Sequence, residues 1–224
     1  GGGEGDHAVF EREPNRVLAR LPGARATANV ASSTLGFSPD AGSRGVGYRQ
    51  REFRVYDGNY VLPGLSFQDV PPCLAVGPYP QCEADVVLMK DRGVTGVLNV
   101  QTDTDHKSRM VDWPQMEGFY GRHGIDVVRV PIEDFNGGEL SRLLRLGVEA
   151  VDGMVKSAEA AGKQPRVYIH CTAGMGRAPA VACVYLVKKA GYGSLAEALA
   201  HVKACRPVSA PNYGSMEQAI KAWA

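Results

Sequence analysis

Apolar positions change their spacing along the chain, and this spacing separates the predicted strands from the predicted helices. Short runs of β-branched and other apolar residues at Leu74–Val76, Val94–Val100 and Ile125–Pro131 predict buried strands. From residue 139 to 161, apolar residues return at helical spacing, which predicts one long helix that Gly162 ends. Strands that alternate with helices in this way indicate an α/β fold around a central, mostly parallel sheet.

Shorter elements are predicted on both sides of that helix. Ser194 and Glu197 form a capping box at the start of a helix that Pro207 ends. The polar run Gln101–Asp105 predicts a loop. Further helices are expected at 83–92, 114–123, 178–190 and 211–223, and short strands at 53–55 and 60–62.

Residues 1–52 differ in composition from the rest of the chain. They are rich in Gly, Ala, Arg and Ser and show no sustained periodicity, which predicts a flexible N-terminal tail before a domain at 53–224. The Arg, Ala and Ser content is compatible with the remnant of a chloroplast transit peptide, but Glu4, Asp6, Glu11 and Glu13 are atypical of one. A simple disordered tail is the alternative interpretation.

Charge and length exclude several classes of partner. A net charge of +1 over 224 residues predicts no polyanionic partner, so we expect no nucleic acid. No apolar run approaches the roughly 18 residues that span a bilayer, so we expect no membrane either. The 5 cysteines are odd in number and widely spaced, which argues against a disulfide scaffold and against a zinc site.

The chemistry is concentrated in one segment, Val167–Pro179, where a β-rich run is followed by two glycines and an apolar helix. Backbone N–H groups at such a strand-to-helix turn converge on one point, and the helix N-terminus favours an anion there. Arg177 would bind two phosphate oxygens with its planar guanidinium. Cys171, at the start of the turn, would be held as a thiolate by the same N–H groups and attack as a nucleophile. A buried structural cysteine beside a tight turn is the alternative.

The string Cys-Thr-Ala-Gly-Met-Gly-Arg-Ala-Pro-Ala resembles the dual-specificity branch of the protein tyrosine phosphatase superfamily, and within it the plant glucan phosphatases and, less closely, laforin. The likeness extends over roughly residues 53–224. It implies a dual-specificity phosphatase fold with a five-stranded sheet, and a cysteinyl-phosphate intermediate that needs no metal or other cofactor. It also implies phosphate release from starch- or glycogen-like α-glucan in the chloroplast, with the cytoplasm as the alternative location. The phosphate-binding loop would comprise His170, Thr172, Ala173, Gly174, Met175 and Gly176.

The resemblance also implies a general acid at Asp134, in the polar loop Ile132–Gly138. A sugar or serine alkoxide is a poor leaving group, so it needs a proton as the P–O bond breaks. The same carboxylate can then deprotonate the water that hydrolyses the intermediate. An acidic turn residue is the plain alternative, and the rival acids are Asp103, Asp105, Asp126 and Glu133.

Three aromatic residues are candidate sugar contacts: Phe135, Trp113 and Tyr60. Each has a core role as its alternative. Plant glucan phosphatases usually carry adjacent aromatics where this chain has His106 and Lys107, which weakens the glucan assignment. No separate carbohydrate-binding module fits outside the domain, so glucan would bind to the domain itself or through a glucan-binding partner protein.

Other functions remain open at this point. A protein dual-specificity phosphatase would use the same mechanism. A catalytically inactive phosphate- or glucan-binding module would have no use for a nucleophile and an acid together, and sulfur-transfer or arsenate-reducing chemistry would not need the Asp134 loop. The resemblance implies that His170 orders the loop by hydrogen bonding and favours the thiolate electrostatically, rather than acting as a base. The other histidines are expected at the surface: His7, His106, His123 and His201.

Overall fold

A computed structural model describes residues 65–223 and, before them, the backbone of five strands at 9–13, 16–20, 29–31, 52–56 and 59–61. These strands are β1 (Val9–Glu13), β2 (Arg16–Arg20), β3 (Asn29–Ala31), β4 (Glu52–Tyr56) and β5 (Asn59–Val61). They form an antiparallel sheet in the order β1-β2-β5-β4-β3. Tyr60 lies in β5, but its side chain is outside the described part of the structure, and so is His7.

This first sheet differs from the irregular tail expected before residue 53. Strand β3, before that boundary, pairs with β4 after it. Local periodicity does not reveal such a sheet, because its strands are short and their partners lie far apart in sequence. The division into a tail at 1–52 and a domain at 53–224 therefore stays a prediction.

The second sheet is the α/β core that the sequence predicts. Its strands are β6 (Gln68–Val70), β7 (Leu74–Gly77), β8 (Gly96–Asn99), β9 (Asp126–Arg129) and β10 (Val167–His170), in the order β6-β7-β10-β8-β9. Only the pairing of β6 with β7 is antiparallel among these five strands. The expected five-stranded, mostly parallel sheet is confirmed.

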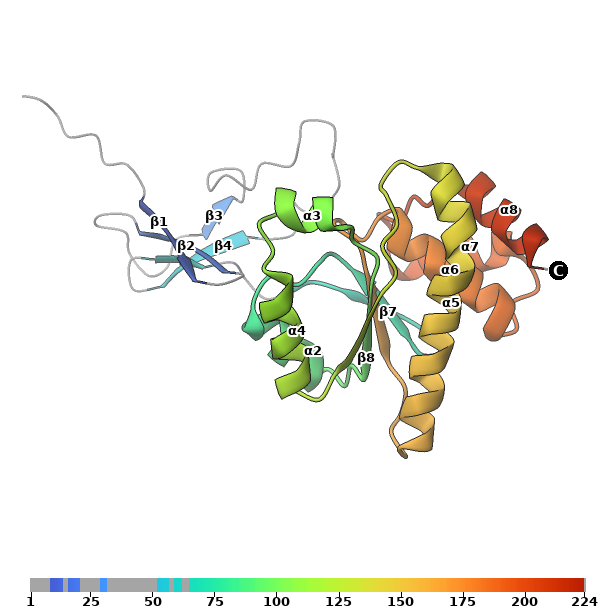
Figure 1. Cartoon of the computed structure of the whole chain (residues 1–224), viewed down its shortest axis with the longest axis horizontal. Coiled ribbons are helices and arrows are strands. Elements are labelled where there is room, and N and C mark those ends of the chain that lie inside the picture. The colour runs from blue at the N-terminus through green and yellow to red at the C-terminus, as the bar shows by residue number, and fades with distance from the viewer. Residues whose placement is uncertain are drawn as a thin grey trace, which may run out of the picture.

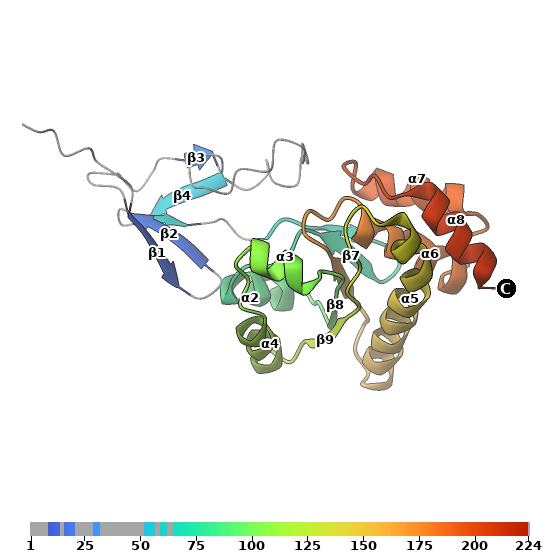
Figure 2. The same cartoon turned by 45° about the horizontal axis from the view of Figure 1, so that its top comes forward.

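Helices cover both faces of this sheet (Figures 1 and 2). On one face lie α5 (Gly137–Ala160), α6 (Arg177–Lys189), α7 (Leu195–Cys205) and α8 (Tyr213–Ala222), and on the other α2 (Glu83–Asp91) and α4 (Trp113–Arg122). Alternate residues of β7 enter the two cores: Leu74 and Val76 pack with α5 to α8, whereas Ala75 packs with α2 and α4. Both faces of the strands are therefore apolar, as is typical of a parallel sheet. In the described part of the chain, no helix combines the length and apolarity that crossing a membrane requires.

Two expectations for the segment after β8 are wrong. Instead of a loop, the chain forms the short helix α3 (Asp103–Ser108), which a capping box of Thr102 and Asp105 begins. His106, expected at the surface, is only 5% exposed, and its ring stacks on Trp113 with 5.2 Å between centroids. Six mostly polar residues carry too little periodicity to predict a helix, so only the capping pattern signals it.

Candidate active site

The turn between β10 and α6 lies at the carboxyl end of the sheet's central strand, where α/β proteins usually bind their ligands. We call residues 171–176 the cysteine loop. Cys171 follows β10 directly and is 3% exposed. The backbone N–H of Gly174 donates a hydrogen bond to its Sγ at 3.2 Å. An amide thus points at the sulfur from inside the loop, as the sequence predicts for an anion-binding turn.

Two glycines allow the cysteine loop to lie against the end of β7. Gly174 has a φ of +66°, in the left-handed region that favours glycine, and a Cβ on it would lie 2.3 Å from the carbonyl oxygen of Gly77. A Cβ on Gly77 would in turn lie 2.5 Å from the hydroxyl of Tyr168. A side chain at Gly174 would push the loop away from β7, and one at Gly77 would clash with Tyr168 and Phe67, so this packing requires both glycines.

Arg177, the first residue of α6, extends its buried guanidinium beneath the loop towards two carboxylates. Its Nη1 donates to Asp105 at 2.7 Å and to the carbonyl of Ile132 at 2.8 Å, and its Nη2 donates to Asp134 at 3.1 Å. Burial opposes the charge, but negative charge at Cys171, Asp105 and Asp134 raises the pKa of Arg177 above its ordinary value. The Nε atom is buried and has no partner among the described residues, which leaves a donor for a ligand oxygen.

Asp105 is the functional residue that sequence reasoning placed only among the rival acids. Its carboxylate accepts hydrogen bonds from both Nη atoms of Arg177, from the hydroxyl of Thr172 at 3.1 Å and from the backbone N–H of Thr102 at 2.9 Å. Burial would raise the pKa of Asp105, but these partners, Arg177 first, hold it below the ordinary value. A capping box directly after a buried strand was the available signal, because it fixes an acidic side chain at the edge of the sheet.

Asp134, the predicted acid, lies on the loop before α5 and contacts the same guanidinium as Asp105, and its side chain is 46% exposed. Among the rivals, Asp103 pairs with Arg129 at 2.7 Å, and Asp126 begins β9 at the opposite end of the sheet. Asp134 is thus an acid that contacts Arg177 while remaining open to solvent, the combination that proton donation to a leaving group needs.

A cleft of about 360 Å³ opens beside Arg177. Phe135 stands at its rim, 99% exposed and with a φ of +59°, a conformation that is rare for a large side chain. The cleft is lined by Glu133, Asp134, Phe135, Asn136, Gly137, Leu140, Gly176, Arg177, Ala210 and Asn212. Phe135 is therefore brought to the site, as the sequence predicts.

Trp113 has a different environment. It is half-buried, stacks on His106, and lies under the guanidinium of Arg129 at 5.0 Å from the ring centroid. It is not among the residues that line the cleft. Its packing matches the core role that the sequence left as the alternative to a sugar contact.

His170 is buried behind the loop, with Nδ1 3.4 Å from the carbonyl oxygen of Cys171. Burial lowers the pKa of His170 to about 3, so its ring is neutral near pH 7. This agrees with an ordering role and not with a charged partner for the sulfur.

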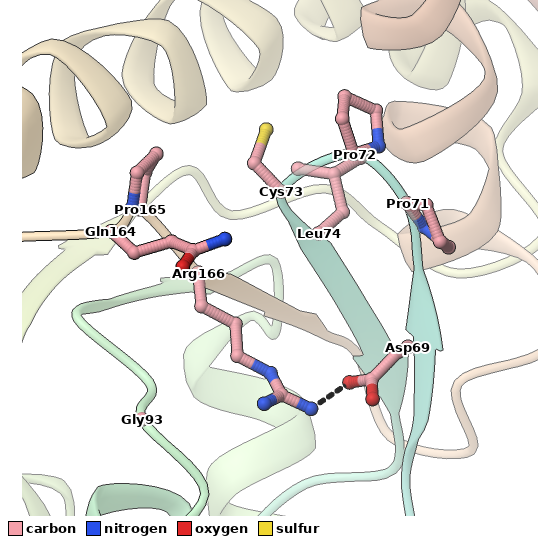
Figure 3. Close-up of a pocket in the computed structure, with 9 residues that line it drawn as sticks. All are labelled: Asp69, Pro71, Pro72, Cys73, Leu74, Gly93, Gln164, Pro165 and Arg166. Carbon is pink, nitrogen blue, oxygen red and sulfur yellow. Dashed lines mark hydrogen bonds and ion pairs between the residues drawn. The ribbon is translucent and has the colours of Figure 1, made fainter.

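Figure 3 shows a second hollow, of about 420 Å³, at the other end of β7 and β10. It contains Cys73, and its floor carries the ion pair between Arg166 and Asp69. Burial raises the pKa of Cys73, and its sulfur contacts the hydroxyl of Tyr185 at 3.5 Å. A thiol in these surroundings is a poor nucleophile. The carboxyl end of the sheet is therefore the better candidate site, although its cleft is the smaller.

Comparison with known proteins gives a match to the family described as "Dual specificity phosphatase, catalytic domain" over residues 76–223. Curated relatives include phosphoglucan phosphatase LSF1, chloroplastic, of Arabidopsis thaliana, 27% identical over 57% of this chain and 20% of its own length. Phosphoglucan phosphatase DSP4, amyloplastic, of Castanea sativa is 32% identical over 58% of this chain and 33% of its own length. Dual specificity protein phosphatase 18 of Mus musculus is 30% identical over 60% and 61%, respectively. The matches thus span less than two thirds of each of these relatives.

Solved structures show the same fold. Human DUSP28 is 28% identical, covers 69% of this chain and 93% of its own, and superposes with a TM-score of 0.52. The human tyrosine phosphatase-like serine/threonine/tyrosine-interacting protein is 21% identical, covers 70% and 95%, and gives a TM-score of 0.55.

Proposed function

The chain belongs to the dual-specificity phosphatase family, a family of cysteine-dependent phosphatases, and from that premise we propose that it dephosphorylates starch- or glycogen-like α-glucan. Cys171 is the nucleophile, Arg177 binds the phosphoryl group, and Asp134 is the general acid. The observation that carries this assignment is the buried, unpartnered Nε of Arg177 in a site where an amide already points at Sγ of Cys171.

In the first step, the phosphate dianion enters the loop and takes hydrogen bonds from its amides and from Arg177. One phosphate oxygen replaces Asp134 at Nη2. The Cys171 thiolate attacks phosphorus, the bond from phosphorus to the sugar oxygen breaks, and Asp134 gives its proton to that oxygen. In the second step, Asp134 takes a proton from water, the water oxygen attacks phosphorus, and the P–S bond breaks. Inorganic phosphate and the free thiolate result.

The lining of the cleft supports a sugar as the leaving group. Arg177 is the single basic side chain among the residues that line it, and the neutral amides of Asn136 and Asn212 lie on its walls. Glu133 adds negative charge, which disfavours acidic phosphopeptides and inositol polyphosphates. Phe135 offers an exposed ring at the rim, and its positive φ is a strained feature of the kind that functional sites retain.

The names of two relatives favour the same substrate and a plastid location, because both are phosphoglucan phosphatases, one chloroplastic and one amyloplastic. Protein dephosphorylation is the alternative, which the match to mouse dual specificity protein phosphatase 18 favours.

The test compares phosphate release from solubilised phosphorylated amylopectin with release from a panel of Ser, Thr and Tyr phosphopeptides. We expect kcat/KM to be higher on amylopectin, and Cys171→Ser to abolish release from every substrate. Faster turnover of the phosphopeptides would replace the glucan assignment by protein phosphatase activity. An active Cys171→Ser variant would remove the mechanism itself.

A further inference from the structure

Four successive carbonyl groups of the cysteine loop, those of residues 172–175, are held by hydrogen bonds from outside the loop. The carbonyl oxygen of Thr172 accepts a hydrogen bond from the N–H of Tyr79 at 3.3 Å, and that of Met175 accepts one from the N–H of Ala210 at 2.7 Å. The two between them, of Ala173 and Gly174, are held by one side chain. That side chain is Arg206, which follows α7 and is 1% exposed.

The geometry of Arg206 fixes two peptide planes. Its Nε donates to the carbonyl of Gly174 at 2.7 Å, and its Nη2 donates to the carbonyl of Ala173 at 3.1 Å. In a trans peptide, the C=O and the following N–H point in opposite directions. A hydrogen bond that draws the Ala173 carbonyl outwards therefore turns the N–H of Gly174 inwards, where it meets Sγ of Cys171 at 3.2 Å. The bond to the Gly174 carbonyl turns the N–H of Met175 the same way.

The charge of Arg206 has no carboxylate partner among the residues that the structure describes. Its acceptors are the two loop carbonyls and the side-chain oxygen of Gln68 on β6. A buried cation that meets only neutral oxygens is costly unless an anion lies nearby. Burial lowers the pKa of Arg206, and negative charge at Tyr168 and Cys171 opposes that change. The anion whose negative charge this cation can stabilise across the loop is the thiolate of Cys171 or a phosphate bound there.

We propose that Arg206 is a positioning residue for phosphoryl transfer: it aims the amides of Gly174 and Met175 at the sulfur and at the phosphate, and adds positive charge behind them. Preorganised donors of this kind stabilise developing charge without reorganisation during the reaction. The inference rests on Cys171 being the nucleophile of the proposed function, but it is independent of the glucan assignment.

The experiment compares Arg206→Gln, which removes the charge, with Arg206→Lys, which keeps the charge but not the two directed bonds. Arg166→Gln is the matched control, because Arg166 also joins a backbone carbonyl and a side chain, at the opposite end of the sheet. Three quantities are measured: the pH midpoint for alkylation of Cys171 by iodoacetamide, followed by peptide mass spectrometry; inhibition by inorganic phosphate; and kcat/KM on para-nitrophenyl phosphate.

For Arg206→Gln we expect a higher alkylation midpoint, weaker inhibition by phosphate and a fall in kcat/KM of about 100-fold, the usual effect of losing an oriented donor to a developing anion. Arg206→Lys should recover part of the alkylation shift, and Arg166→Gln should leave the midpoint unchanged. A wild-type midpoint and wild-type phosphate inhibition in folded Arg206→Gln would overturn the proposal and leave Arg206 a purely structural residue.

Gln68→Leu provides a second variant if Arg206→Gln does not fold. It removes the acceptor that holds Nη1 of Arg206, so a smaller shift of the alkylation midpoint in the same direction is expected. No shift in folded Gln68→Leu would count against the proposal. Full activity of Cys171→Ser on para-nitrophenyl phosphate would instead refute the proposed function, whatever the Arg206 variants do.

Discussion

Asp105→Asn tests the geometry of the site most directly, because Asp105 binds both Nη atoms of Arg177 and is not among the residues that line the cleft. The substitution keeps the shape of the side chain and removes its charge. It also places an NH2 group against donors that face the carboxylate. These are Nη1 of Arg177 at 2.7 Å and the N–H of Thr102 at 2.9 Å if the group replaces Oδ2, or Nη2 of Arg177 at 3.3 Å and the hydroxyl of Thr172 at 3.1 Å if it replaces Oδ1. Arg177 then loses its two-pronged anchor while remaining buried.

The magnitude follows from the burial of the pair. Removing one partner of a buried ion pair costs about 3–5 kcal/mol. The side chain of Asp105 is 17% exposed and Asp134 remains beside Arg177, so the lower end applies, about 3 kcal/mol of unfolding free energy. For activity, one lost charge-assisted hydrogen bond of about 2 kcal/mol corresponds to a fall in kcat/KM of about 30-fold.

The assay measures unfolding by urea and kcat/KM on para-nitrophenyl phosphate, with Asp103→Asn as the control. Asp103 lies on the same helix and also pairs with an arginine, but its side chain is 90% exposed. The stability difference between wild type and Asp105→Asn should be constant above pH 5. It should shrink as pH falls through the folded-state pKa of Asp105, because that pKa lies below its ordinary value and protonation removes the charge.

Two results would refute this reasoning. A folded Asp105→Asn enzyme with kcat/KM within about threefold of wild type would show that Arg177 does not depend on this carboxylate. An equal loss in Asp103→Asn would show that the effect comes from the charge of helix α3 as a whole.

The catalytic acid and the rim aromatic give two further predictions. Asp134→Ala should lower kcat about 100-fold on phosphorylated amylopectin, whose alkoxide needs a proton, but much less on para-nitrophenyl phosphate, whose leaving group does not; equal losses on both would exclude Asp134 as the acid. Phe135→Ala should lower kcat/KM on amylopectin about fivefold relative to para-nitrophenyl phosphate, the contribution of one stacked ring. An unchanged ratio between the two substrates would mean that the ring does not contact glucan.

The parts of the site that the sequence predicts are local in the chain. A single loop, which contains Cys171 and the glycines, joins strand β10 to helix α6, whose first residue is Arg177. The short spacing in the sequence is therefore enough to predict that these residues lie close together. The loop with Asp134 follows a strand of the same sheet, and its carboxyl end comes to the same edge. Because β8 pairs in parallel with both β9 and β10, the carboxyl ends of all three strands lie at one edge of the sheet, which makes that contact a consequence of topology.

The contacts that the sequence does not predict join distant residues. Asp105 precedes Arg177 by 72 positions, and Arg206 follows Gly174 by 32. Nothing in the local pattern at either position specifies its partner, and an acidic residue in a short helix or an arginine after a helix is usually a solvated side chain. Burial is the property that distinguishes these two, and it becomes visible only when helix packing is known.

Arg177 links the two carboxylates of the site to the binding of phosphate. Its positive charge is shared by Asp105 and Asp134, and of these two carboxylates only Asp105 is anchored by a helix cap. An entering phosphate dianion competes for Nη2 with Asp134, the more exposed and less constrained of the two carboxylates. Once displaced, Asp134 loses its contact with Arg177 and stands beside the bound phosphate, where it can donate a proton to the leaving oxygen.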